Sequence, residues 1–434
     1  RTAAIEQAES RREARRHQII RAKKSTATAA TVRVAQDQML REDAERQKRS
    51  QQPAVVWVDL MRMEPRGANG GIKPLVYGFL RELTQLNWQP LRFVLLIQEQ
   101  LAPEISFLRP SDVLAIRTPT GWKVKTPDGA SSELSADELL SAHPPEVLYS
   151  PFGTSAYARP DLPQVALLVD SLHRDLPSAL PIEEVNFREE SFKRVIGSHA
   201  WIQTLAEHGR ERLQHHWQVP ATRCFHTYAS VQGRLAGRTK PSTRPPALPD
   251  KTFFFYPANF WPHKNHEVLL TAYHKYRYTT GEEAWDLLLT GHPDERMTTL
   301  QEMSSALNLE SNVHFAGHLP DDAFQGVWQF AGALVFPSLH EGFGIPLVEA
   351  FQSQLPVIAA KTSVLPEVGG DACHWFDPRS PDALAEAMAK ITADEAFRRK
   401  LIAAGQSRLT RFSQHYEASR LNHYLYAAAR NLVP

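Results

Sequence analysis

The chain has 434 residues, 42% of them hydrophobic, and its 49 Lys and Arg nearly balance its 48 Asp and Glu. This length allows two or three domains with ordinary cores, and the near-neutral charge argues against a nucleic-acid-binding protein. The two cysteines, Cys224 and Cys373, exclude a disulfide framework and a zinc cluster, and are typical of the reducing cytoplasm. No apolar run reaches roughly 18 residues, so we predict no membrane-spanning helix.

Residues 1–52 hold 13 Lys and Arg against 7 Asp and Glu, which leaves 36 against 41 for the remainder. They contain few large apolar side chains, which predicts an N-terminal helical extension or linker. Their apolar residues keep no heptad, so a coiled coil is weakly supported. Coupling to an upstream domain or self-association, and peripheral membrane contact, are the alternatives. Because the first residue is Arg1, the chain is consistent with a part excised from a longer polypeptide.

The first folded domain is placed at residues 53–236. Val55–Leu60 predicts a buried strand, Gly70 and Gly71 a tight loop, and Pro74–Leu86 a helix. This order is typical of a Rossmann-like unit. Further strands are predicted at 92–97, 147–149, 165–169 and 223–228, helices at 183–196 and 200–217, and irregular structure at 113–145.

Polar residues follow the predicted strand at 165–169, in the sequence V-D-S-L-H-R-D-L-P. Asp170 and His173 therefore lie at the carboxyl end of a parallel strand, where open α/β sheets bind ligands. Both are candidate site residues, and a surface histidine is the alternative interpretation of His173.

A linker is predicted at residues 237–250, which are rich in proline and almost without large apolar side chains. The second domain is placed at 251–411, where strands and helices alternate as in a parallel sheet covered by helices. Residues 412–434 are predicted to form a C-terminal helix. The strands expected here lie at 253–257, 286–290, 313–315, 333–336 and 356–360, and the helices at 295–307, 321–330 and 381–431.

The most informative stretch, residues 333–351, reads A-L-V-F-P-S-L-H-E-G-F-G-I-P-L-V-E-A-F. A buried strand gives way to a loop with Gly342 and Gly344, and Pro346 stands at the start of a helix, where its missing N–H costs nothing. A strand, a glycine loop and a helix start make an anion site, since free N–H groups and the helix dipole favour negative charge there.

Two carboxylates flank this loop. Glu341 precedes it, and Glu349 is expected in the first helical turn, eight positions later. A carboxylate repels a bound phosphate, so it is useful there only if it accepts hydrogen bonds from sugar or ribose hydroxyls. The alternative is that Glu349 only complements the helix dipole and that the glycines only mark a loop.

The stretch E-G-F-G-I-P-L-V-E resembles the Glu-x7-Glu motif of retaining nucleotide-sugar glycosyltransferases with the GT-B fold, in glycosyltransferase family four. A-N-F-W-P-H-K-N-H-E resembles the donor-phosphate loop of that family, and T-S-V-L-P-E-V-G-G-D-A its segment ending Pro-Glu-x-x-Gly-Asp-Ala. The resemblance covers residues 253–412 and, less closely, 55–232. It implies two Rossmann-like domains facing a cleft, with the last helix crossing back to the first domain.

The resemblance also implies roles for the matched residues. Lys264 would neutralise the donor diphosphate, and Glu349 would accept from the ribose. Glu341 would hold the transferred sugar and, with Asp170 and His173, make up the catalytic set. The other donor-binding positions implied are Asn259, Gly344, Ile345, Pro346, Leu347, His318, Leu319, Gly70 and Gly71.

The chain departs from the family pattern at two places. Asn259 or Phe260 stands where the family often has an Arg, which makes Lys264 more critical. Val169 stands where the family often has a His that touches the transferred sugar. Two interpretations stay open: His173 substitutes for it, or the acceptor is handled differently.

The function implied is a retaining transfer of a hexose, with mannose from GDP-mannose favoured, to a growing glycan or lipid-linked saccharide in bacterial O-antigen or capsule assembly. No enzyme nucleophile is evident, so the leaving phosphate is expected to take the acceptor proton. Nucleotide sugar and saccharide acceptor are the expected partners. The expected location is the cytoplasm, with peripheral contact at the inner face of the plasma membrane as the alternative.

No cofactor or metal is expected, because His263 and His266 lack accompanying acidic or Cys ligands. Two other functions stay open. One is a non-catalytic GT-B module with a scaffolding role. The other is a dinucleotide-dependent oxidoreductase, which is disfavoured because Leu347 occupies the place of the third glycine of G-x-G-x-x-G.

Overall fold

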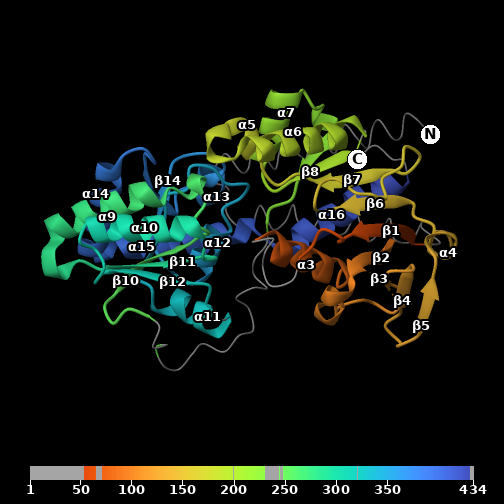
Figure 1. Ribbon diagram of the computed structural model, residues 1–434, viewed down its shortest axis with the longest axis horizontal. Coiled ribbons are helices and arrows are strands. Elements are labelled where there is room, and N and C mark those ends of the chain that lie inside the picture. The colour runs from red at the N-terminus through yellow and green to blue at the C-terminus, as the bar shows by residue number, and fades with distance from the viewer. Residues whose placement is uncertain are drawn as a thin grey trace.

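The computed structural model describes residues 53–64, 71–198, 200–229, 244, 248–319 and 321–430. Within them, two α/β domains lie side by side along the long axis of the molecule (Figure 1). The predicted extension at 1–52, Gly70 and most of the predicted linker lie outside the described residues. Among the described helices, none combines the length and hydropathy that a membrane span requires.

The first domain is built on a sheet whose nine described strands are ordered β5-β4-β3-β2-β1-β6-β7-β8-β9. The long apolar runs of its central strands suit a sheet buried on both faces. The strands are β1 (Ala54–Asp59), β2 (Leu91–Gln98), β3 (Val113–Arg117), β4 (Trp122–Lys125), β5 (Ser131–Leu134), β6 (Val147–Ser150), β7 (Gln164–Leu167), β8 (Trp201–Thr204) and β9 (Cys224–His226). The α-helices are α3 (Ile72–Leu83), α4 (Ala136–Ala142), α5 (Leu172–Asp175), α6 (Ile182–Gly197) and α7 (Glu207–Trp217).

Two predictions for this domain were wrong. Residues 113–145 are not irregular, because their turn residues separate short strands. β3 pairs parallel with β2, and β4 and β5 extend the sheet in antiparallel pairing. Residues 200–217 are not one helix, because Trp201–Thr204 pairs with β7 and β9 before α7 begins. Four residues are too few for periodicity to distinguish a strand from a helix.

The second domain has six described strands in the order β12-β11-β10-β13-β14-β15, all parallel. The predicted alternation of strands and helices is confirmed here. The strands are β10 (Phe253–Pro257), β11 (Asp286–Thr290), β12 (Val313–Gly317), β13 (Ala333–Phe336), β14 (Val357–Ala360) and β15 (Cys373–Phe376). The α-helices are α9 (His266–Thr280), α10 (Glu295–Ala306), α11 (Asp321–Phe330), α12 (Ile345–Gln352), α13 (Leu365–Gly369), α14 (Pro381–Ala393) and α15 (Glu395–Arg408).

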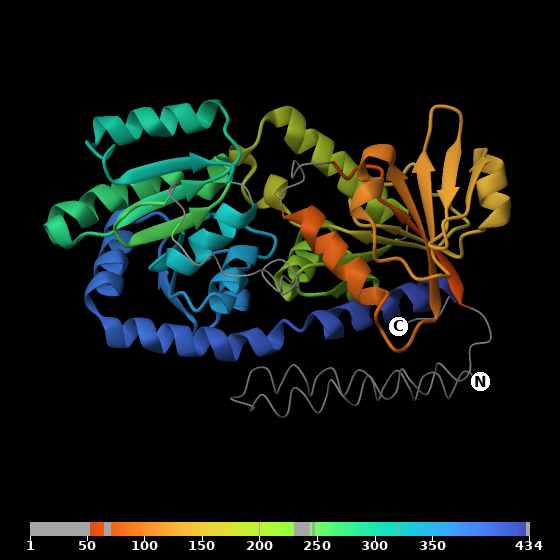
Figure 2. The ribbon, with the colours of Figure 1, turned by 90° about the horizontal axis from the view of Figure 1, so that it is seen from below.

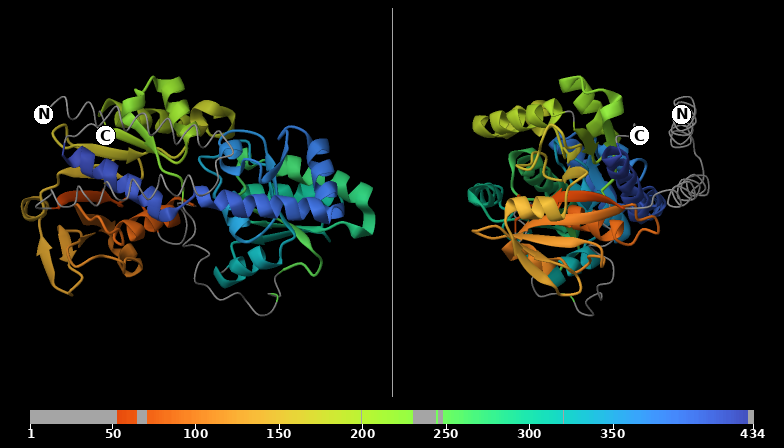
Figure 3. Two further views of the ribbon diagram at one scale, coloured as in Figure 1. Left: turned by 180° about the vertical axis from the view of Figure 1, so that it is seen from behind. Right: turned by 90° about the vertical axis from the view of Figure 1, so that its right-hand side faces the viewer.

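The last helix, α16 (Gln414–Ala429), packs against α3, β1 and β6 of the first domain. The Gln414 amide donates to the carbonyl of Gly78 (3.0 Å), and the Asn422 amide donates to the carbonyl of Trp88 (3.1 Å). Figures 2 and 3 show the C-terminal helices running along both domains. The chain therefore ties its domains together twice, once between β9 and β10 and once through α16.

Two further contacts fix the interface between the domains. The ring of Phe343, from the glycine loop, packs against Tyr228 (centroids 6.0 Å apart) and Phe412 (5.7 Å). The carboxylate of Glu367 accepts hydrogen bonds from the main-chain N–H groups of Glu207 (2.8 Å) and His208 (2.7 Å), and from the Tyr228 hydroxyl (3.0 Å). A residue of the second domain thus caps helix α7 of the first.

Candidate active site

The donor side of the site is formed by two loops of the second domain, one after β10 and one after β13. The N–H of Leu339 donates to the carbonyl of His263 (2.8 Å), and the Tyr256 hydroxyl bonds both the carbonyl of Lys264 (2.8 Å) and Ser338 Oγ (2.9 Å). Parallel strands β10 and β13 are neighbours, so their carboxyl ends bring the loops together. These bonds place Lys264 beside the glycine loop.

Gly344 forms the N-terminal cap of α12 with a φ of +86°. A Cβ atom there would lie 2.7 Å from Leu365 Cδ2, so both the backbone and the packing require glycine. Ile345, Pro346 and Leu347 form the first turn. Pro346 has no N–H, and the N–H of Leu347 donates to the carbonyl of Gly344 (3.0 Å), so an anion here would be bound by the Ile345 N–H and the helix dipole; this anion site stays a prediction.

Lys264 Nζ lies 2.6 Å from Glu341 Oε1, and each of the two side chains is 13% exposed. The predicted phosphate-binding cation and the predicted sugar-binding carboxylate therefore neutralise each other in this structure. A diphosphate bound at α12 would compete with Glu341 for the ammonium of Lys264.

Glu349 is the fifth residue of α12 and not, as predicted, part of its first turn. The reason is that the helix begins at Ile345, directly after the glycine cap. The Glu349 side chain is 1% exposed. It is therefore held inside the second domain, one turn along α12 from the predicted anion site.

The backbone of the first domain is in close contact with these loops. A Cβ atom on Gly342 would lie 2.5 Å from the carbonyl oxygen of Val169, and one on Gly71 would lie 3.1 Å from Ile345 Cδ1. Gly71 therefore lies across the interface against the start of α12, and Gly342 is in close contact with the loop that follows β7.

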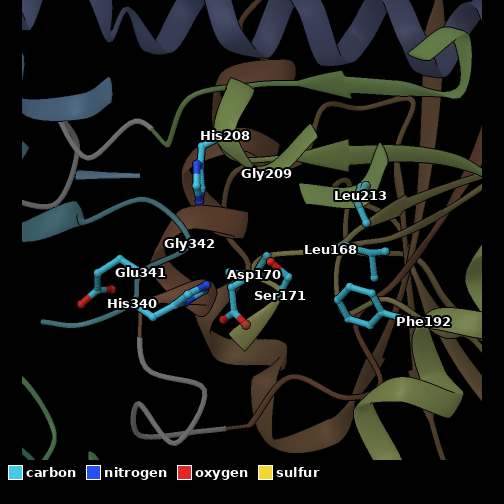
Figure 4. Close-up of a pocket in the computed structure, with 11 residues that line it drawn as sticks. Leu168, Asp170, Ser171, Phe192, His208, Gly209, Leu213, His340, Glu341 and Gly342 are labelled. Atoms are coloured by element: carbon cyan, nitrogen blue, oxygen red, sulfur yellow. The ribbon is translucent and has the colours of Figure 1, made fainter. Parts of the chain in front are cut away.

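A pocket lies at this junction (Figure 4). Its lining residues come from the loops after β7 and β13 and from α6 and α7: Leu168, Val169, Asp170, Ser171, Phe192, His208, Gly209, Leu213, His340, Glu341 and Gly342. Asp170 Oδ1 accepts hydrogen bonds from the N–H of Leu172 (3.0 Å) and from Arg188 (3.2 Å). Burial raises the pKa of Asp170, but Arg188 and then His340 outweigh it, so the pKa lies below its usual value.

Residues 240–408 match the protein family described as "Glycosyl transferases group 1". This segment is a glycosyl transferases group 1 domain. It contains Lys264, the glycine loop and both glutamates, and the predicted family resemblance is thereby confirmed for the second domain. The family match does not by itself test the Glu-x7-Glu motif.

Curated relatives of the chain include two from Escherichia coli. "O-antigen chain mannosyltransferase B" is 26% identical over 241 residues, covering 55% of this chain and 63% of the relative. "Serotype-specific mannosyltransferase WbdA" is 34% identical over 170 residues, covering 38% of this chain and 20% of the relative. The chain thus spans less than two thirds of the length of either relative.

Solved structures extend the similarity in fold to both domains of the chain. A sucrose-phosphate synthase from Thermosynechococcus elongatus superposes with a TM-score of 0.65 at 17% identity, covering 86% of this chain and 98% of that one. WaaG, "a glycosyltransferase involved in lipopolysaccharide biosynthesis", gives 0.59 at 14% identity, covering 85% and 99%. At these identities the similarity establishes the fold alone, which is the predicted GT-B fold.

Three predicted donor-binding residues lie at the carboxyl-terminal edge of the sheet of the second domain. Asn259 Oδ1 accepts from the N–H of His292 (2.9 Å) and so fastens the loop after β11. His318 is exposed and Leu319 is 9% exposed, and both directly follow β12. Their proximity to a nucleotide base stays a prediction.

His173 is not brought to the pocket. Its side chain is 0% exposed, and its ring packs against Phe192 (centroids 4.7 Å apart) and Trp217 (5.6 Å). Its Nε2 lies 3.5 Å from Glu189 Oε2, and burial lowers its pKa. The residue is the second of the short helix α5, and its ring packs against α6 and α7 rather than in the pocket.

A cluster of polar side chains around Asp175 lies beside the pocket and was not predicted from the sequence. Asp175 accepts hydrogen bonds from Ser171 Oγ, from Arg212, from His216 Nε2 (2.8 Å) and from His340 Nε2 (3.0 Å). Burial raises the pKa of Asp175, but these donors, His340 first, hold it well below its usual range. Two features of the sequence could have indicated this cluster: Asp175 is a second Asp in the segment that follows β7, and His340 directly precedes Glu341.

Proposed function

We propose that this chain is a retaining glycosyltransferase that moves a hexose, with mannose from GDP-mannose favoured, onto a growing glycan or lipid-linked saccharide of a bacterial surface polysaccharide. The observation that carries the proposal is the placement of the Lys264–Glu341 ion pair in the loops beside the start of α12, at the junction with the other domain. Both curated relatives are named as mannosyltransferases, and one as an O-antigen chain enzyme, which favours mannose as the sugar and O-antigen as the product.

In the proposed reaction the diphosphate binds at the N-terminal end of α12, where the Ile345 N–H and the helix dipole meet it, and binds the Lys264 ammonium; together these groups stabilise the charge of the leaving group. The acceptor oxygen forms a bond to the anomeric carbon while the bond from that carbon to the phosphate oxygen breaks. The leaving diphosphate takes the acceptor proton. Glu341 turns from Lys264 to the hydroxyls of the transferred sugar, and Glu349 accepts from the ribose.

No metal or cofactor takes part in this proposal. The reaction would take place in the cytoplasm, at the inner face of the plasma membrane when the acceptor is lipid-linked. Its partners would be the nucleotide sugar and the saccharide acceptor.

A thermal-shift screen of nucleoside-diphosphate sugars tests the donor. A donor present at 100 times its dissociation constant adds roughly 2.7 kcal/mol of stability. We expect GDP-mannose to give the largest shift, Lys264→Ala to abolish it, and wild-type protein to release GDP when a mannoside acceptor is added. Donor binding without GDP release would instead identify a non-catalytic GT-B module, and no shift with any nucleotide sugar would refute the proposal.

A further inference from the structure

His340 and Glu341 are neighbours in the chain, but their side chains point in opposite directions. In Figure 4 the Glu341 carboxylate points away from the pocket, and the His340 imidazole points toward Asp170 and Ser171 of the other domain. The His340 side chain is 7% exposed, and its Nε2 lies 3.0 Å from Asp175 Oδ2. In this dipeptide Glu341 therefore faces the proposed donor side, and His340 faces the pocket.

The bond to Asp175 fixes the tautomer of His340. Asp175 is surrounded by donors from Ser171, Arg212 and His216, and its side chain is 12% exposed. Such a carboxylate is ionised and can only accept hydrogen bonds, so Nε2 of His340 carries the proton. In the neutral ring the lone pair then lies on Nδ1, which makes no hydrogen bond to any residue that the structure describes.

The pocket is lined by both apolar and polar side chains. Leu168, Phe192 and Leu213 line it with apolar atoms, and Asp170, His208 and His340 add polar groups.

The pocket belongs mainly to the first domain. Of its eleven lining residues, only His340, Glu341 and Gly342 come from the domain that holds Lys264 and α12. If the donor binds at α12, the pocket is on the acceptor side of the reaction.

We infer that His340 is an acceptor-binding residue: its Nδ1 accepts a hydrogen bond from the attacking hydroxyl of the acceptor saccharide. Asp175 is a positioning residue, which holds the ring and its tautomer from the other domain. His340 orients the hydroxyl and takes no proton, because the proton leaves with the diphosphate. Holding the oxygen close to the anomeric carbon lowers the entropic barrier. This inference rests on the proposed function.

Two substitutions separate the two ring nitrogens. His340→Gln places an amide near the former Nε2, so it can still donate to Asp175 but offers no acceptor at the Nδ1 position. His340→Asn places its amide near the former Nδ1 and loses Asp175. With GDP-mannose as donor and α-mannotriose as acceptor, we expect His340→Gln to lose about tenfold or more in kcat/KM for the acceptor, and His340→Asn to retain more activity.

Asp175→Asn should lower the same constant while leaving the KM for GDP-mannose and the affinity for GDP unchanged. His215→Gln, at an exposed position of α7 outside the pocket, is the matched control and should behave as wild type. A purely structural contact between domains predicts the reverse order, with His340→Gln near wild type and His340→Asn impaired, and that result would overturn the inference.

Hydrolysis of GDP-mannose without acceptor provides a second readout. We expect His340→Gln to reduce hydrolysis less than it reduces transfer. A parallel loss of hydrolysis and transfer would place His340 on the donor sugar and overturn the acceptor role. Failure of the proposed function itself would be seen in the wild-type protein, as no transfer from GDP-mannose, and so is distinguishable from failure of this inference.

Discussion

The cap that Glu367 places on helix α7 predicts a stability effect that crosses the domain boundary. Glu367 lies in the glycosyl transferases group 1 domain, but its carboxylate accepts two main-chain N–H groups at the start of α7 and the hydroxyl of Tyr228. Glu367→Gln keeps the shape of the side chain. It also replaces one accepting oxygen by an NH2 group that faces an N–H donor.

The magnitude follows from these bonds. A hydrogen bond to a charged group contributes about 1.5–3 kcal/mol, and a carboxylate at a helix N-terminus adds about 0.3–1 kcal/mol. Glu367 is half-buried, and water can take over part of the lost bonding, so we expect a net loss of about 2–4 kcal/mol. For a domain of this size that corresponds to a fall of about 5–10 °C in the transition temperature.

Differential scanning calorimetry is the appropriate assay, because a two-domain protein need not unfold in one step. The transition of the first domain should shift downward although the substitution is in the second. Glu386→Gln, at an exposed position of α14, is the matched control. Unfolding of Glu367→Gln that coincides with wild type and control would refute the idea that the carboxylate stabilises α7.

Three further outcomes follow from the site. Glu341→Gln should raise the affinity for GDP about fivefold to tenfold, because Lys264 would no longer be neutralised, and should impair transfer; calorimetric titration with an unchanged Kd would contradict this. Glu349→Gln should weaken GDP binding about tenfold to hundredfold in the same titration, and full affinity would remove Glu349 from the ribose site. His266 is 1% exposed, and burial first, then nearby Arg296 and Lys264, lowers its pKa to about 3. The unfolded chain protonates it below about pH 6.5 and the folded protein does not, so stability should fall with pH down to about 3. His266→Phe should show about 2 kcal/mol less loss at pH 5 in urea titrations, and parallel curves for both proteins would refute the assignment.

The sequence by itself determined the scaffold of the donor side. The apolar run at 333–336, the loop with Gly344 and the proline of the first turn are local signals, and the structure has β13, the glycine cap and α12 where these signals predict them. Such signals suffice because a buried parallel strand, a positive φ and a helix start each depend on a few consecutive residues. The alternation of apolar runs with helical segments likewise predicted the parallel sheet of the second domain.

Only the tertiary structure decided which polar side chains meet. Asp170 and His173 are three residues apart, yet Asp170 lines the pocket and His173 is buried against Phe192, because a short helix rotates one relative to the other. The bonds of Asp175 to His340 and of Glu367 to α7 join residues more than a hundred positions apart. No local pattern encodes these pairs, since each depends on how the two domains pack together, and that packing is set by the apolar interface and by α16.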